Sequence, residues 1–182
     1  MYLDALAKVP PRADNGDVHV LVETPTGSRD KFDLDHEYGL FKWSLQLPSG
    51  LSFPFSFGFV PNTLAEDGDP LDIVLLVEGR FPQGTLVRSR LVGVLVASQD
   101  EDGDGRTETQ NDRILAVPTL AQTYAKVDDI SDLRDSFHDE LSMFFRSYNE
   151  LIGRGLDVAE PLGRDAAYER LDRAIARHRN ER

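Results

Sequence analysis

The chain contains no cysteine. This absence excludes disulfide bonds, metal sites built on thiolates and catalysis by a cysteine nucleophile. It also fits a reducing compartment, and we expect the protein to be cytoplasmic. Residues 1–8 have neither the basic start nor the long apolar stretch of a secretory signal, so the sequence predicts no such signal.

Basic residues are scarce, because 20 Lys and Arg stand against 32 Asp and Glu and give a formal net charge of −12. A chain of this charge repels the phosphate backbone of nucleic acids and the surface of anionic membranes. Long hydrophobic runs are also missing, since no apolar run approaches the ~20 residues that span a bilayer. We therefore expect no nucleic-acid partner and no membrane partner. The four histidines are scattered without the spacing of a zinc site.

The 182 residues suit a single domain, because no internal repeat or low-complexity linker divides them. Residues 1–16 contain Pro10-Pro11 and Asn15-Gly16 and are expected to form a loose arm. The runs that read as strands are Val18–Glu23, Lys31–Asp35, Gly39–Leu45, Ile73–Val77, Leu86–Val96 and Arg113–Val117, and Phe53–Phe59 is an aromatic block expected in the core and barrel wall. So many short strands with turn residues between them favour a small antiparallel barrel.

The C-terminal third follows a helical period instead. Apolar side chains recur at steps of three and four residues over 132–152, which predicts an amphipathic helix there. These side chains belong to Leu133, Phe137, Leu141, Phe144, Tyr148 and Leu151. Ala167, Leu171 and Ile175 predict a second, more polar helix over 164–180. The predicted fold class is therefore α+β, mainly β, with helices packed outside a barrel.

The most informative segment is Glu66–Asp72, with the sequence E-D-G-D-P-L-D. Three aspartates, Asp67, Asp69 and Asp72, fall within six positions directly before a hydrophobic strand. Carboxylates this close repel one another unless water solvates them or cations neutralise them, and hard ions such as Mg²⁺ take oxygen ligands. Gly68 permits a sharp turn and Pro70 fixes φ, which would hold the carboxylates in place. The plain alternative is a solvated acidic turn.

With its surroundings, this segment resembles the family I inorganic pyrophosphatases. Further matches, in the family's order and approximate spacing, are Glu23-Thr24-Pro25, Lys31-Phe32-Asp33, Phe53-Pro54 with Phe57-Gly58-Phe59, Pro82-Gln83-Gly84, Val92–Leu95, Leu115–Pro118 and Phe144-Phe145 with Tyr148. The resemblance runs from about Val18 to about Leu151. It implies a five-stranded OB-like antiparallel barrel with flanking C-terminal helices, and a homo-oligomer.

The resemblance also implies a reaction, the Mg²⁺-dependent hydrolysis of inorganic diphosphate to two phosphates by a metal-activated water, with Mn²⁺ as an alternative ion. Phosphoryl transfer needs charge neutralisation, alignment and an activated water more than it needs covalent help. Two other functions stay open. One is the hydrolysis of another phosphoanhydride, and the other is the binding of phosphorylated ligands by a catalytically weakened relative.

By the same resemblance, residues of the matching motifs have roles in this reaction. Asp69 is the expected general base. The expected metal ligands are carboxylates from three segments, namely Asp67, Asp72, Glu23 and Asp33, of which Asp72 would bridge two ions. The expected phosphate ligands are cationic or phenolic, namely Lys31, Arg113 and Tyr148.

Several positions depart from the family pattern. The family arginine of the third strand aligns with Ser44 or Leu45, and Lys42, on the same strand face as Ser44, is the candidate substitute. The family's paired tyrosines are Phe53 and Phe57, so two hydroxyl groups are missing. The lysine that follows the C-terminal tyrosine in the family is Asn149 here. These losses remove phosphate-binding groups and predict a divergent member.

The family's D-x-K sequence reads Asn111-Asp112-Arg113. Asn111 offers a neutral oxygen, and Asp112 points to the other strand face unless a bulge redirects it, so both remain candidate metal ligands. A further metal carboxylate is expected among Asp100, Glu101 and Asp102, with Asp100 preferred. Residues 100–105 also resemble the start of a calcium loop, but the twelfth position of that loop is not a glutamate.

Overall fold

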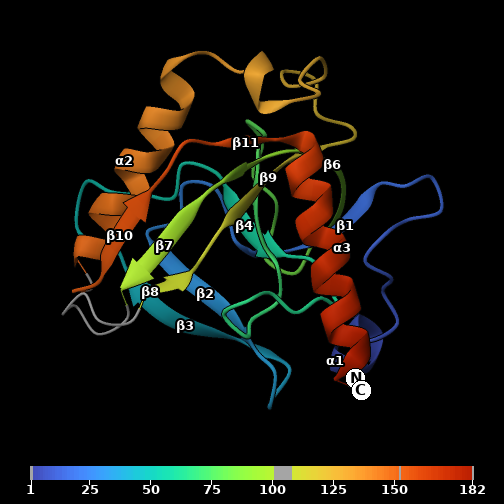
Figure 1. Cartoon of the computed structure of the whole chain (residues 1–182). Coiled ribbons are helices and arrows are strands. Elements are labelled where there is room, and N and C mark those ends of the chain that lie inside the picture. Colours follow the sequence, from blue (N-terminus) through green and yellow to red (C-terminus); the bar gives the residue numbers. More distant parts are fainter. Residues whose placement is uncertain (1, 101–107, 152, 182) are drawn as a thin grey trace.

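The computed structural model describes residues 2–100, 108–151 and 153–181, with the backbone alone at Tyr2, Asp100 and Glu108. The helices are α1 (Tyr2–Leu6), α2 (Ser136–Leu151) and α3 (Arg164–Asn180), with a 3-10 turn η1 (Ile130–Asp132). The strands are β1 (Val18–Thr24), β2 (Asp30–Asp35), β3 (Leu40–Gln46), β4 (Ser56–Phe59), β5 (Asp72–Leu75), β6 (Leu86–Leu95), β7 (Ala97–Asp100), β8 (Glu108–Gln110), β9 (Arg113–Pro118), β10 (Gly155–Val158) and β11 (Leu162–Gly163). Figure 1 shows α2 and α3 on opposite sides of the strands.

Five strands form a closed barrel in the order β1-β4-β5-β9-β6, and a β1–β6 pairing closes it. This confirms the predicted barrel, with one difference, because β5 and β9 run parallel. The β1 and β4 backbones approach closely at Gly58, where an added Cβ would lie 1.9 Å from the carbonyl oxygen of Leu21. Only glycine fits there, which explains the glycine inside the aromatic block.

From Ile73 on, the β5 strand and the residue after it are apolar on both faces, and both faces are covered. Ile73 and Leu75 of β5 lie in a core cluster with Leu171 of α3. Val74 and Leu76 point the other way, into a cluster with Phe137 of α2. An uninterrupted apolar run such as residues 73–76 is what a strand buried on both sides requires.

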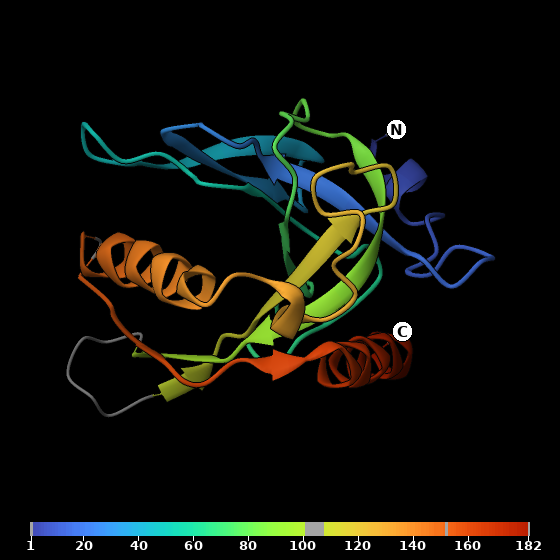
Figure 2. The same cartoon turned by 90° about the horizontal axis from the view of Figure 1, so that it is seen from above.

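Two smaller sheets lie outside the barrel. The predicted strands over residues 31–35 and 39–45 pair with each other as the β2–β3 hairpin, not with the barrel. Figure 2 shows this hairpin on the same side of the barrel as α2. The second small sheet has the order β10-β7-β8. Its short strands carry no clear alternation, and the sequence did not predict them.

The helix ends differ from prediction at one point. α3 spans the residues predicted for it, but α2 begins at Ser136 because η1 and a short connection precede it. Asp129 holds η1 against α3, since its carboxylate accepts hydrogen bonds from the backbone N–H groups of Ser131 at 3.0 Å and Arg164 at 2.7 Å. The expected loose arm contains α1 and a β-bridge between Arg12 and Val18. Within the described residues, no helix is long and apolar enough to cross a membrane.

Candidate active site

The acidic segment lies in the loop between β4 and β5 and ends at Asp72, the first residue of β5, and hydrogen bonds within residues 60–71 close this loop. The buried Thr63 hydroxyl donates to the Val60 carbonyl at 2.6 Å and accepts the Leu71 N–H at 3.0 Å. Gly68 has a φ of +91°, a conformation that glycine adopts without strain. The loop therefore presents its aspartates from a defined backbone.

The three aspartates of this loop interact with one another. The Asp69 N–H donates to Asp67 Oδ1 at 3.1 Å, and the Asp69 side chain is exposed. Burial raises the pKa of Asp67, and the charges of Asp72 and Asp69 raise it further. Burial also raises the pKa of Asp72, although Arg113 and Lys31 partly offset the rise. The carboxyl groups of Asp67 and Asp72 therefore ionise less readily than free ones, and a bound cation would favour their charged form.

Strands β1 and β2 bring three more predicted residues to the same cluster. Glu23 Oε1 accepts the Leu34 N–H at 2.7 Å, and burial, assisted by the charges of Asp72 and Asp33, raises the pKa of Glu23 to about 8. Lys31 Nζ lies 2.5 Å from Asp33 Oδ1. Burial lowers the pKa of Lys31, but its anionic neighbours raise it by more, so Lys31 stays a cation.

Tyr148 reaches the cluster from α2. Its ring lies 6.0 Å from that of Phe53 and stacks on Phe144 at 6.2 Å. Burial raises the pKa of Tyr148, and Lys31 offsets part of the rise, so the hydroxyl stays protonated at neutral pH. Phe53 also packs on Phe57 at 5.2 Å. The two phenylalanines that replace tyrosines thus support the Tyr148 ring without adding hydroxyl groups.

Arg113, the first residue of β9, contacts both the acidic segment and the side-chain amide of Asn111, which in turn bonds to that of Gln99. Its Nη1 lies 3.4 Å from Asp72 Oδ2, and its guanidinium lies 5.6 Å above the centre of the Phe145 ring. It also donates to the Asn111 carbonyl at 2.7 Å and to the Asn111 side-chain oxygen. The Asn111 amide donates to Gln99 Oε1 at 2.7 Å. Asn111 therefore faces the site.

Gln99 was missed by the sequence reasoning. It is buried, at 5% exposed, and it orients the amide of Asn111. The only signal in the sequence was its place one residue before the acidic stretch that begins at Asp100. The contact itself follows from the pairing of β7 with β8, which the sequence did not predict.

Asp112 points away from Asn111 and Arg113, as alternation along an extended chain requires. Its Oδ2 lies 2.5 Å from Arg170 Nε, and its Oδ1 accepts the Ala97 N–H at 3.1 Å. The Asp112 side chain is only 9% exposed. Its carboxylate is thus engaged by α3 and β7, whereas Asn111 is bonded to Arg113 and Gln99.

The β2–β3 register bears on the position of the missing arginine. Leu45 is the cross-strand partner of Lys31, but the register shifts there, and the Ser44 hydroxyl donates to the Lys31 carbonyl at 3.2 Å, so both positions lie beside that lysine. Of the two residues, Leu45 is the less exposed. Lys42 is the partner of Asp33, and its side chain is exposed. It therefore lies at the edge of the cluster.

The remaining predicted carboxylates come from the segment that follows β7. The backbone of Asp100 ends β7, but its side chain lies outside the described part of the chain. Glu101 and Asp102 also lie outside the described residues, as does most of the stretch that resembles a calcium loop.

The donor set suits a hard divalent cation by its chemistry, because it consists of carboxylate groups. Burial, together with the neighbouring carboxylates, raises the pKa values of three of them, Glu23, Asp67 and Asp72. In residues 2–100, 108–151 and 153–181, no three acidic or histidine side chains converge on one metal-sized point. Asp67 and Asp72 are the best candidates to hold an ion, and Asp69 is the exposed carboxylate beside them.

Comparisons with known proteins bear on this geometry. A family model described as inorganic pyrophosphatase matches residues 20–179 of the chain. The chain belongs to the inorganic pyrophosphatase family. Within it, the enzyme of Synechocystis is 38% identical over 159 residues, which cover 87% of this chain and 88% of that protein. The enzyme of Streptomyces coelicolor is 34% identical over 164 residues, which cover 89% and 96%.

Solved structures of the family have the same fold. The inorganic pyrophosphatase of Thermus thermophilus superposes with a TM-score of 0.85 at 31% identity, over 96% of this chain and 98% of that one. The Helicobacter pylori inorganic pyrophosphatase superposes with a TM-score of 0.83 at 30% identity, over 94% and 99%. Members of the family hydrolyse diphosphate to two phosphates, and they depend on metal ions.

Proposed function

We propose that this chain is an active inorganic diphosphatase that uses Mg²⁺, or Mn²⁺ in its place. One observation carries the proposal. Arg113 Nη1 of β9 lies 3.4 Å from Asp72 Oδ2 of the acidic segment, and Lys31 Nζ of β2 lies 2.5 Å from Asp33 Oδ1. Carboxylates for a cation thus lie beside donors for phosphate oxygens, as phosphoryl transfer requires.

Each group has a distinct task in the proposed reaction. Asp67 and Asp72 would hold the divalent ion, Glu23 and Asp33 would hold further ions on the substrate side, and Asn111 is a candidate ligand. The ions would neutralise charge and make water more acidic. Asp69, which is exposed and beside this pair, accepts the proton of the attacking water at its carboxylate.

The remaining groups bind the substrate. Lys31 and Arg113 bind phosphoryl oxygens through N–H donors, and Lys42 approaches from the edge. Tyr148 donates its hydroxyl hydrogen, which the raised pKa keeps in place at neutral pH. Cations and a phenol around one phosphate group neutralise its charge and fix its orientation.

Phe53, Phe57 and the residue at the arginine position, Ser44 or Leu45, favour a second candidate function. They remove a cation and two hydroxyl groups, which would weaken diphosphate binding and leave room for a longer phosphoanhydride. A phosphate-binding role without turnover is the third candidate. Phosphate release from diphosphate and from tripolyphosphate, each with and without Mg²⁺, separates the three. No release from either substrate at saturating Mg²⁺ or Mn²⁺, from neutral to alkaline pH, would refute the enzymatic proposals.

We also propose that the protein works in the cytoplasm as a homo-oligomer. The location rests on the family and on the absence of cysteine, and the oligomer rests on the family alone. Light scattering after size exclusion tests the oligomer, and a single-chain mass at micromolar concentration would contradict it. Fractionation of the native cell tests the location.

A further inference from the structure

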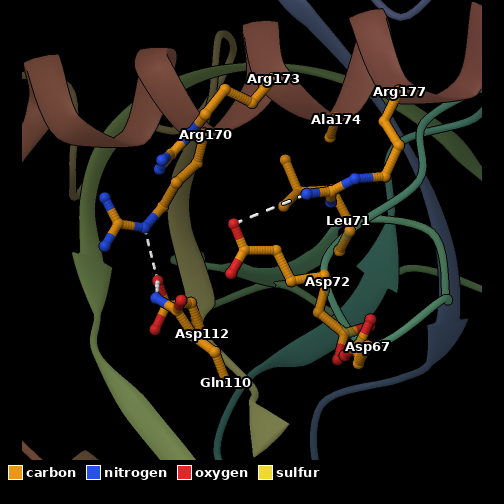
Figure 3. A pocket seen from close by; sticks show the side chains of 11 residues that line it. Asp67, Leu71, Asp72, Gln110, Asp112, Arg170, Arg173, Ala174 and Arg177 are labelled. Atoms are coloured by element: carbon orange, nitrogen blue, oxygen red, sulfur yellow. Dashed lines mark hydrogen bonds and ion pairs between the residues drawn. The ribbon is translucent and has the colours of Figure 1, made fainter.

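The C-terminal helix α3 turns a face of arginines toward the acidic loop. Arg170, Arg173 and Arg177 follow one another at steps of three and four residues, so they share one side of the helix. Together with Asp67 and Asp72 they line a cavity of about 40 Å³ (Figure 3). The arginine face of α3 and the carboxylates of the proposed metal site therefore line the same cavity.

The first link between α3 and the site runs through Asp112. Its ion pair with Arg170 is nearly buried, because the side chains are 14% and 9% exposed. Gln110 Nε2 donates to Asp112 Oδ2 at 3.0 Å as well. With Asp112 held toward α3 by these bonds, the side chains of Asn111 and Arg113 bond to each other instead, and Arg113 Nη1 lies 3.4 Å from Asp72 Oδ2.

The second link reaches the loop itself. Arg177 Nη2 lies 3.6 Å from Glu66 Oε1, and Arg177 Nη1 donates to the Leu64 carbonyl at 3.3 Å. The Leu64 N–H in turn donates to the Ala174 carbonyl of α3 at 3.0 Å. Three contacts thus hold residues 64–66, directly before Asp67.

We propose that Arg170 and Arg177 are positioning residues of the metal site. Arg170 acts through Asp112 on Asn111 and Arg113, and Arg177 acts through Glu66 on Asp67. α3 thereby fixes the two segments that carry the ligands relative to each other. This inference rests on the proposed function only for the location of the metal.

The arginines are not needed to dock the helix. Its apolar face already does so, since Ala167, Leu171 and Ala174 are 0–2% exposed in the barrel core. A buried ion pair adds little to stability compared with such packing. Residues that orient metal ligands, in contrast, typically change metal affinity or activity by about 10–100-fold when they are replaced.

Calorimetric titration of Mn²⁺ into the substrate-free protein provides the test. We expect Arg170→Gln and Arg177→Gln each to weaken Mn²⁺ binding by about tenfold or more. Arg177→Lys should restore most of the affinity, because a 3.6 Å ion pair needs the charge more than the guanidinium geometry. If Arg170→Gln fails to fold because it leaves the Asp112 carboxylate unpaired, the double variant Asp112→Asn/Arg170→Gln replaces it, because that variant leaves no buried charge without a partner.

Two controls come from the same helix. Asp172→Asn breaks the 2.7 Å ion pair with Arg12, which links α3 to the N-terminal segment and not to the site. Arg173→Gln removes a positive charge from the same face. Both controls should leave the dissociation constant for Mn²⁺ within about twofold.

The outcomes are distinct. A lower melting temperature with unchanged Mn²⁺ affinity in the Arg170 and Arg177 variants would make these residues merely structural and overturn the inference. An equal loss of affinity in Arg173→Gln would show a general charge effect and overturn it too. A wild-type protein that binds Mn²⁺ but releases no phosphate would refute the proposed function while leaving this test intact.

Discussion

Replacing Asp69 by asparagine separates the proposed chemistry from the fold. In the described part of the chain, no hydrogen bond or ion pair involves the Asp69 carboxylate; its backbone N–H donates to Asp67 Oδ1, and its backbone carbonyl accepts the Ala65 N–H at 2.7 Å. Asp69→Asn keeps the shape of the side chain and these backbone contacts. We therefore expect its free energy of unfolding to stay within about 0.5 kcal/mol of the parent, as for most surface substitutions.

The expected loss of turnover is much larger. A positioned general base contributes roughly 10²–10⁴-fold, so kcat should fall by at least about 100-fold. That factor corresponds to about 2.7 kcal/mol of activation free energy. Because we assign the ion to Asp67 and Asp72, Mn²⁺ affinity should change by less than about threefold.

Phosphate release at saturating Mg²⁺ gives kcat, and calorimetry gives the Mn²⁺ affinity. The matched control is Asp14→Asn, which removes one exposed carboxylate from the N-terminal segment. A kcat within about tenfold of the parent would refute the role of Asp69. So would a loss of Mn²⁺ affinity as large as that of Asp72→Asn, because Asp69 would then be a ligand.

Three further predictions concern metal, substrate and pH. Mg²⁺ at ~100 times its dissociation constant should stabilise the fold by about 2.7 kcal/mol, which a melting scan would show as a rise of roughly 5–10 °C in Tm. Asp67→Ala/Asp72→Ala should abolish this rise, and NaCl at matched ionic strength should not produce it. Leu45→Arg/Phe57→Tyr should lower KM about tenfold, because one aligned charged hydrogen bond contributes about 1.5–3 kcal/mol; an unchanged KM in steady-state assays would contradict this. Asp129, whose pKa is lowered by its hydrogen bond from the first N–H of α3, stabilises the fold above its ordinary pKa of 3.8 and loses this effect as pH falls. Asp129→Ala should therefore cost about 1 kcal/mol at pH 7, and urea denaturation should show the difference closing toward pH 3; an equal cost at both pH values would show that its charge is irrelevant.

The regular elements were predictable because their patterns are local. The residues of α3 follow from a helical period, and the apolar run that begins at Ile73 follows from a strand buried on both faces. The pairing of β5 with β9 in parallel was not predictable, because it joins residues about 40 positions apart and leaves no mark on either strand. The short strands of the outer sheet also gave no signal, since their stability comes from their neighbours.

The residues of the candidate site likewise differ in whether the sequence could predict them. Asp67, Asp69 and Asp72 lie in one short loop, so their proximity could be predicted from spacing alone. Glu23, Lys31 and Tyr148 were named by resemblance, and the fold brings them into electrostatic contact with one another or with the loop. Gln99 could not be found, because its role depends on a contact with a side chain 12 residues away.

The sequence by itself determined the acidic loop, the helical and strand segments and the family to which they belong. The tertiary structure decided which side chains share a face. Asp112 and Asn111 are neighbours in sequence, yet one pairs with Arg170 of α3 and the other meets Gln99 of β7. The physical reason is that side chains alternate along an extended chain, so their direction depends on strand register and on packing partners distant in sequence.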